Sequence, residues 1–164
     1  MAENSIVLSD SSPLIGMAAA GCFDALRDLF GTVSITESVR KEVTAGQHLP
    51  GAAEAARGLK SGWIQRLPDP RGAVTLPTLG AGEATTLYAA VRLGPTCLVL
   101  LDDAAARAEA RALGITVTGT AGILLAARRR KLIHAVRPCF EKLIASGFRM
   151  SPGVIKAILD EAGE

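Results

Sequence analysis

Short, continuous apolar runs alternate with helical segments along this chain, and this alternation constrains the fold more than any other feature. One run, residues 6–9, leads to Asp10, and another, residues 97–101, leads to Asp102 and Asp103. Strands of a parallel sheet are buried on both faces and therefore read as continuous apolar runs. Alternation with helices at this spacing predicts right-handed crossovers, and so an α/β fold with helices on both faces of a parallel sheet.

The same pattern predicts the individual elements. The apolar runs predict strands at residues 6–9, 33–35, 63–65, 96–101 and 115–118. Apolar residues at helical spacing predict helices at residues 14–20, 23–30, 36–43, 52–59, 82–93, 104–113, 121–131, 141–146 and 152–162. Ser12 before Pro13 fits an N-cap followed by proline at the first helical position. Residues 68–77, with three prolines and a glycine, predict a connecting loop.

The composition indicates a globular intracellular protein. A chain of 164 residues with 49% hydrophobic and 21% charged residues can bury a sizeable core, and a net charge of +2 does not by itself indicate a nucleic-acid partner. The odd number of widely spaced cysteines indicates reduced, buried thiols and a cytoplasmic location. Residues 79–101 are not expected to span a membrane, because Glu83, Arg92 and Pro95 interrupt them.

Acidic residues stand at four places where predicted strands end or predicted helices begin: Asp10, Glu42, Glu83 and the pair Asp102–Asp103. Ligands of open α/β sheets gather at the carboxyl ends of the strands. Carboxylates that converge there repel one another unless protons or hard cations neutralise them, and Mg²⁺ or Mn²⁺ prefers such oxygen ligands. The pattern therefore predicts a divalent-metal site.

Asp10 and Glu42 also have structural interpretations, but the metal interpretation is favoured for both. Asp10 is suited to capping a helix, yet Ser12 can already serve as the N-cap and leaves Asp10 without that duty. Val39 and Val43 flank Glu42 on the buried side of its helix, which places its carboxylate beside the apolar stripe.

The remaining acids leave alternatives open. Glu83 lies in a first helical turn, where the helix dipole explains an acid as well as a metal does. Either Asp102 or Asp103 can cap the next helix and leave the other for a cation. Asp102 is assigned to the metal because it directly ends the apolar run, with Asp103 as the alternative. Thr118 and Thr120 are expected to cap the helix that starts at residue 121 rather than to bind a ligand water.

The ordered set of these segments resembles the PIN-domain family, specifically small prokaryotic members akin to VapC-type toxins. The resembling segments are residues 9–15 (SDSSPLI), 39–43 (VRKEV), 80–84 (GAGEA), 98–103 (LVLLDD) and 112–120 (ALGITVTGT). They follow the family's order over roughly residues 5–135.

The resemblance implies a three-layer α/β/α sandwich with a central parallel sheet, to which the sequence adds the C-terminal helices predicted above. It maps the family's acids onto Asp10, Glu42, Glu83 and Asp102, and it places Ser11 at a small hydroxyl position near the metal. It also implies a PIN-like nuclease domain of residues 1–137. Residues 138–164 extend past the usual short toxin, and their own apolar spacing predicts a C-terminal helical extension. The apolar stripe of that extension is expected to pack on the domain or on a partner subunit.

The resemblance further implies a divalent-metal-dependent endoribonuclease that uses Mg²⁺ or Mn²⁺ to cleave RNA. We expect a cytoplasmic toxin of a toxin–antitoxin pair, with a small antitoxin as partner, a homodimeric state and no membrane attachment. The alternative is a catalytically inactive PIN-like module that binds RNA or protein. A metal-dependent phosphatase is disfavoured, because the residue two positions after Asp10 is Ser12 rather than an aspartate. No glycine-rich phosphate loop follows a predicted strand, which argues against a nucleotide-binding enzyme.

Overall fold

Five parallel strands form the centre of the computed structural model, which describes residues 6–46, 48–72 and 78–164. Within these residues the strands are β1 (Ile6–Ser9), β2 (Val33–Thr36), β3 (Ile64–Leu67), β4 (Cys97–Leu100) and β5 (Thr116–Thr118). Their order across the sheet is β3-β2-β1-β4-β5, and every neighbouring pair is parallel. The predicted central parallel sheet is confirmed, with a strand at each predicted apolar run.

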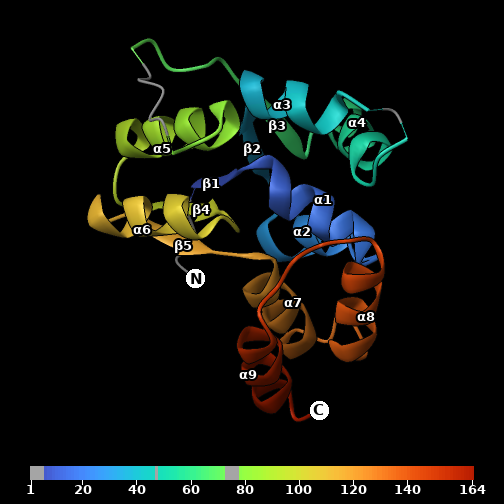
Figure 1. Ribbon diagram of the computed structural model, residues 1–164. Coiled ribbons are helices and arrows are strands. Elements are labelled where there is room, and N and C mark those ends of the chain that lie inside the picture. The colour runs from blue at the N-terminus through green and yellow to red at the C-terminus, as the bar shows by residue number, and fades with distance from the viewer. Residues whose placement is uncertain (1–5, 47, 73–77) are drawn as a thin grey trace.

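Helices lie on both faces of this sheet. The described helices are α1 (Ser11–Ala19), α2 (Asp24–Phe30), α3 (Glu37–Thr44), α4 (Ala52–Ser61), α5 (Ala81–Leu93), α6 (Ala104–Ala112), α7 (Thr120–Arg129), α8 (Arg137–Ala145) and α9 (Pro152–Ala162). Helices α5 and α6 cover one face, and α1, α2 and α7 cover the other (Figure 1). The predicted three-layer α/β/α sandwich is therefore confirmed. Helix α3 contacts both α1 and α5, and so lies between the two helical layers.

Neighbouring side chains of the central strands point to opposite faces of the sheet. In β1, Val7 joins the hydrophobic cluster that includes α1, α2 and α7, whereas Leu8 joins the cluster under α5 and α6. In β4, Leu100 and Val99 divide between the same two clusters. Each central strand thus closes two apolar interfaces, which is why its sequence is a continuous apolar run.

Two helix starts differ from the prediction. Helix α1 begins at Ser11 with Asp10 at its N-cap, so the prediction that Ser12 caps this helix is wrong. The pairing of β1 with β4 holds Asp10 in an extended conformation, and this places the cap one residue after the strand. Helix α7 begins at Thr120 with Gly119 at its N-cap, so neither predicted threonine caps it. The hydroxyl of Thr120 is engaged with a carboxylate instead.

The segment between β3 and α5 is only partly described. Residues 68–72 form neither helix nor strand, as the predicted loop requires, and residues 73–77 of that loop lie outside the described residues. None of the described helices has the length and apolar character needed to cross a membrane.

The last two helices pack onto the same core as the sheet. Phe140 and Leu143 of α8 and Leu159 of α9 are buried in the cluster that includes α1, α2 and α7. Helix α8 begins at Arg137 rather than at the predicted residue 141, because Pro138 is accommodated in its first turn.

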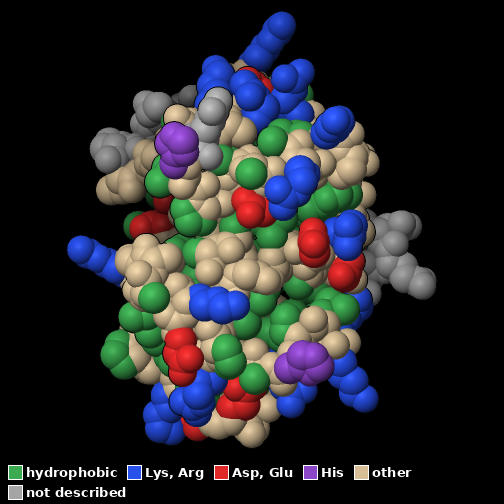
Figure 2. All heavy atoms as spheres, turned by 90° about the vertical axis from the view of Figure 1, so that its right-hand side faces the viewer, with side chains coloured by type: hydrophobic (Ala, Val, Ile, Leu, Met, Phe, Trp, Pro, Cys, Tyr) green, Lys and Arg blue, Asp and Glu red, His purple; other side chains and the backbone are tan. Residues whose placement is uncertain are grey.

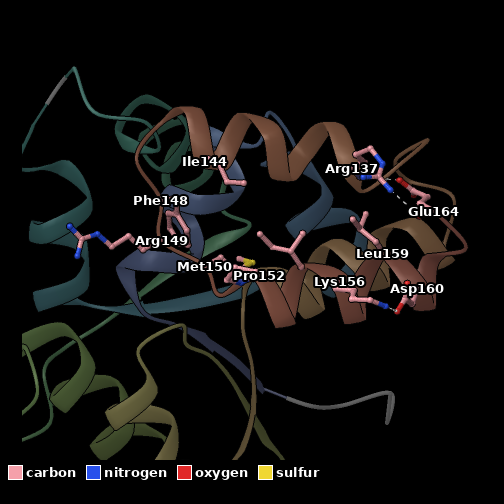
Figure 3. Close-up of a pocket in the computed structure, with 11 residues that line it drawn as sticks. Arg137, Ile144, Phe148, Arg149, Met150, Pro152, Lys156, Leu159, Asp160 and Glu164 are labelled. Carbon is pink, nitrogen blue, oxygen red and sulfur yellow. Dashed lines mark hydrogen bonds and ion pairs between the residues drawn. The ribbon is translucent and has the colours of Figure 1, made fainter.

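The end of the described chain is also fixed against α8. The carboxylate of Glu164 accepts hydrogen bonds from the backbone N–H groups of Val136 and Arg137, at 2.8 and 3.0 Å. Between α8 and α9 lies a cavity of about 610 Å³, whose lining includes Ile144, Phe148 and Leu159 (Figure 3).

The single tryptophan lies where α4 leads into β3. Trp63 is partly buried against the main cluster, and its ring meets that of Phe23 edge to face, with centroids 5.6 Å apart and planes inclined at 62°. Aromatic pairs with this geometry are attractive beyond the area they bury. The contact joins the start of β3 to the connection between α1 and α2.

Replacing Phe140 by alanine should destabilise the protein strongly. Phe140 is 2% exposed, and its removal would leave a cavity where α8 meets the core, at a cost of about 3–5 kcal/mol in unfolding free energy. Ile144 is the matched control, because it lies one turn later on α8 and is 56% exposed. Ile144→Ala should change the unfolding free energy by less than about 1 kcal/mol. Urea denaturation followed by circular dichroism measures both, and equal small losses would contradict the packing of α8 on the core.

Candidate functional site

Asp10 lies where the order of the strands reverses. The chain runs from β1 outward to β2 and β3, and then returns to β4 on the other side of β1. Strand β1 pairs with β4 so that Ser9 lies opposite Leu100, and the backbone N–H of Asp10 donates to the carbonyl of Leu100 at 3.0 Å. Open α/β sheets bind ligands in the crevice beyond the carboxyl ends of strands at such a reversal. Asp10 therefore occupies the position expected of a ligand-binding residue.

The carboxylate of Asp10 has few hydrogen-bond donors. The residue is 1% exposed, its Oδ2 accepts one long bond of 3.4 Å from the N–H of Ser12, and its Oδ1 has no partner among the described residues. Burial raises the pKa of Asp10 to about 7, against the lowering effect of the N–H groups of Ser11 and Ser12. The negative charges of Glu42 and Glu83 raise it further. A buried oxygen without a donor is a position that a cation can fill.

Glu42 reaches the same point from α3. Its Oε2 accepts a hydrogen bond from the hydroxyl of Ser11 at 2.9 Å, and its Oε1 accepts one from the N–H of Gly82 at 2.8 Å. A Cβ atom at Gly82 would lie 2.9 Å from Oδ1 of Asp10 and would collide with Oε2 of Glu42. The structure thus brings Asp10, Ser11 and Glu42 together around a small space in front of the first turn of α5.

Glu83 lies near this pair but turns toward the start of its own helix. Its Oε2 accepts a hydrogen bond from the N–H of Gly80 at 2.8 Å, which satisfies a free N–H before α5. Burial raises the pKa of Glu83, the bond from Gly80 lowers it, and the charges of Asp103 and Glu42 raise it. Glu83 is therefore in electrostatic contact with the other acids, and both of its interpretations stay open.

Thr120 holds the carboxylate of Asp102. Oδ1 accepts the N–H of Thr120 at 2.8 Å, and Oδ2 accepts its hydroxyl at 2.6 Å. Burial raises the pKa of Asp102, while the two bonds from Thr120 and the charge of Arg107 lower it. Asp102 thereby ties the end of β4 to the first turn of α7.

Asp103 is the N-cap of α6, as one of the two adjacent aspartates was expected to be. Its Oδ1 accepts the N–H of Ala106 at 2.8 Å. Both aspartates after β4 therefore have partners at helix starts, and the geometry leaves the choice between Asp102 and Asp103 as a metal ligand open.

Three residues shape this site that the sequence analysis did not single out: Gly82, Gly119 and Arg107. A Cβ atom at Gly119 would lie 2.6 Å from Nη1 of Arg107 and 2.7 Å from Oδ1 of Asp102. Glycine therefore lets a guanidinium and a carboxylate approach the backbone between β5 and α7. The two glycines could have been found from their positions in the sequence. Gly82 directly precedes the acid Glu83, and Gly119 follows a predicted strand.

The pair Asp10–Glu42 fits a hard divalent cation. Among residues 6–46, 48–72 and 78–164, no three Asp, Glu, His or Cys side chains are placed to hold one ion together. The two carboxylates nevertheless face one space, and Oδ1 of Asp10 has no other partner within the described chain. Mg²⁺ is commonly held by one or two protein carboxylates, while water and substrate phosphates supply its other ligands. Two carboxylates are therefore compatible with such an ion, and the metal role of this pair and of the wider set of four stays a prediction.

Asp10→Asn should remove a loss of stability that the wild-type protein undergoes as the pH rises. The unfolded chain releases the Asp10 proton near pH 3.8, whereas the folded protein holds it up to about pH 7. Because the folded state binds this proton more tightly, its contribution to the unfolding free energy falls as the pH rises from about 4 to about 7 and is level above that range. Asparagine keeps the helix cap but carries no charge.

Urea denaturation in EDTA across this pH range measures the effect. The stability of the variant minus that of the wild type should grow by about 2–4 kcal/mol through the window. Glu141→Gln, which removes a carboxylate at an exposed position of α8, is the matched control. Parallel profiles for wild type and Asp10→Asn would contradict a buried, uncompensated carboxylate.

Comparison with known proteins identifies the family. A search of curated proteins finds no match to this sequence. A family model described as a PIN domain matches residues 6–164, and this range includes α8 and α9 as well as the sheet. The match agrees with the resemblance carried by the acidic segments and with the parallel α/β/α architecture. This chain belongs to the PIN-domain family.

Proposed function

We propose that this protein is a divalent-metal-dependent endoribonuclease centred on Asp10 and Glu42. The observation that carries the proposal is the buried Oδ1 of Asp10, which has no hydrogen-bond partner in the described chain and faces the same space as the Glu42 carboxylate. An uncompensated charge at such a place is costly, and a bound cation would offset that cost. The PIN domain is a nuclease-type fold, which supports a phosphodiester as the bond that is cut.

The residues of the proposed centre have two roles: some bind the metal, and others orient the residues that bind it. Asp10 and Glu42 would hold Mg²⁺ or Mn²⁺, and the bound ion would lower the pKa of a water molecule and neutralise charge on the phosphate. Ser11 and the N–H of Gly82 orient Glu42, because each donates a hydrogen bond to one of its carboxylate oxygens. Glu83 adds a third acceptor for water on the same side of the sheet.

The residues after β4 complete the proposed site. Asp102 and Asp103 add two further carboxylates to the proposed site, with Asp102 as the preferred metal ligand and Asp103 as the alternative. Arg107 lies beside Asp102 and Gly119. This position supports a role for its guanidinium in binding an RNA phosphate. Such a contact would position the strand without performing chemistry.

Support for RNA as the substrate comes from the family rather than from the overall charge. The net charge is only +2. The face shown in Figure 2, which is the right-hand side of Figure 1, mixes basic and acidic side chains over its whole extent. A path for an anionic strand along this face would need positive charge to dominate, so we place the strand at the proposed metal centre, along Arg107.

We further propose that the protein is the toxin of a toxin–antitoxin pair, is homodimeric and is neutralised by a small antitoxin. The resemblance of the acidic segments to VapC-type toxins supports this role. It is separable from the nuclease proposal, since a nuclease needs no antitoxin to cleave RNA.

The alternative is a PIN-like module that binds RNA or protein without cleaving it. One observation favours it: four of the acids already accept hydrogen bonds at helix starts, Asp10 from Ser12, Glu83 from Gly80, Asp102 from Thr120 and Asp103 from Ala106. Asp10 weighs against it, because its Oδ1 has no structural partner in the described residues.

RNA cleavage should depend on metal and on the Asp10–Glu42 pair. Purified protein should cut single-stranded RNA with Mg²⁺ or Mn²⁺, stop with EDTA and cut more slowly as salt rises, because phosphate contacts release counterions. Asp10→Asn and Glu42→Gln should each lower the rate by at least about 100-fold, since even outer partners of metal ligands are worth about 10–100-fold. Gel electrophoresis of a labelled oligonucleotide measures the rates.

Controls separate the candidate roles. Glu141→Gln removes an exposed acid of α8 and should cut at the wild-type rate. Asp102→Asn should lose more activity than Asp103→Asn, and the reverse order would assign the ligand to Asp103. If the pure protein binds RNA but cuts none with either metal, the binding module replaces the nuclease.

Gly82→Ala should disable the centre while leaving the fold intact. The new methyl group would meet the ends of the Asp10 and Glu42 side chains, which can give way, rather than fixed backbone. Gly153→Ala is a matched control, because Gly153 is also the second residue of its helix and a Cβ atom there meets nothing within 4 Å. We expect Gly82→Ala to lose at least about tenfold in Mg²⁺ affinity by calorimetry. Wild-type affinity in that variant would contradict the position of the metal.

A further inference from the structure

Cys22 and Cys139 form a thiol pair at the opposite end of α1 from Asp10. Cys22 lies in the connection between α1 and α2, and Cys139 lies in the first turn of α8. Their Sγ atoms are 3.2 Å apart although the residues are 117 positions apart in the sequence. Helix α8 contacts α1 and lies beside the α1–α2 connection in Figure 1. The fold therefore brings two thiols together from distant segments.

The two sulfurs are placed to be joined. A disulfide has an S–S distance of about 2.05 Å, so closing this pair requires a shift of about 1 Å between the sulfur atoms. Rotation of the two side chains can supply a shift of this size. Both thiols are free in the structure.

The two thiols differ in access. Cys22 lines an open cavity of about 320 Å³ together with acidic and basic side chains, among them Asp24, Asp28 and Arg57. Cys139 is buried, at 6% exposed, whereas Cys22 is only partly buried. A small oxidant that enters from solvent therefore meets Cys22 first.

The electrostatic surroundings of Cys22 and Cys139 also differ, and they too favour Cys22 as the reactive thiol. The hydrogen bond with Cys139 lowers the pKa of Cys22 to about 7, burial opposes this, and the positive charge of Lys142 adds to the lowering. The same bond raises the pKa of Cys139, so Cys139 keeps its proton while Cys22 becomes the thiolate. Cys97 is the contrasting case, because burial raises its pKa to about 11.

We propose that Cys22 and Cys139 are a redox modification site that takes hydroperoxides, with Cys22 as the attacking thiol and Cys139 as the resolving thiol. The Cys22 thiolate attacks one peroxide oxygen, the O–O bond breaks, and Cys22 sulfenic acid forms while the other oxygen leaves as alkoxide or hydroxide and takes up a proton. The sulfur of Cys139 then attacks the sulfur of Cys22. The S–O bond breaks, the S–S bond forms, and water leaves with the thiol proton. Two thiols are oxidised by two electrons, and one hydroperoxide is reduced to an alcohol or water.

The disulfide would fasten α8 to the end of α1. It would close a loop from residue 22 to residue 139, and cross-links across long loops restrict the unfolded chain most. The metal ligands proposed above lie at the other end of α1, so oxidation would raise stability without consuming any of them. This inference does not depend on the nuclease activity.

The test uses the full chain, reduced, freed of reductant and treated with a small excess of hydrogen peroxide. Free thiols per chain, counted under denaturing conditions, should fall from three to one. Peptide mapping should show a Cys22–Cys139 bridge with Cys97 still reduced. The oxidised protein should melt several degrees higher, and dithiothreitol should reverse the shift. A bridge that involves Cys97, bridges between chains only, or three surviving thiols would overturn the proposal.

Variants assign the roles of the two thiols. Cys139→Ser should accumulate sulfenic acid at Cys22, which dimedone labels, whereas Cys22→Ser should give no label at Cys139. Lys142→Met should slow thiol loss several-fold, and Cys97→Ser should form the bridge at the wild-type rate. Labelling at Cys139 in the absence of Cys22 would reverse the assignment. If a serine variant does not fold, the wild-type peptide map still decides whether the bridge forms.

Discussion

The parallel pairing of β1 with β4 is the contact on which the rest of the structure depends. It sets the reversal of strand order, divides the two hydrophobic clusters and carries Asp10 and the aspartates after β4 to one edge of the sheet. The pairing continues one step beyond β1, through the N–H of Asp10, and so draws the carboxylate into the protein. The contact that creates the site is also what makes a charge there costly. The stability of the fold therefore competes with the metal-binding role proposed for Asp10.

The elements of the fold were largely predictable because each strand seals two apolar faces and so leaves a continuous run in the sequence. The first residues of the helices were less predictable. Ser12 before Pro13 is a valid cap signal, and Asp10 is equally suited to that role. What decides between them is the hydrogen bond from Asp10 to Leu100, which lies ninety positions later in the chain and so leaves no local signature.

The position of the candidate site was predictable from topology, but the orientation of its side chains was not. Acids at the ends of β1 and β4 had to meet at one edge. Whether Asp102 faces the space in front of Asp10 or turns to Thr120 depends on how α7 packs against β5. Gly82 was not predicted for a related reason. It matters because its missing side chain leaves room for the carboxylates of Asp10 and Glu42, and these come from distant parts of the chain.

The edge-to-face contact of Trp63 with Phe23 has a practical consequence for the study of this chain. A protein with one tryptophan has one principal source of intrinsic fluorescence, and here it lies against the residue that follows Cys22. Tryptophan emission should therefore report on packing around the α1–α2 connection, where the thiols meet. It should change little when ions bind at the carboxylates. Spectroscopy of the unlabelled protein can thus follow one end of α1 while the other end is titrated.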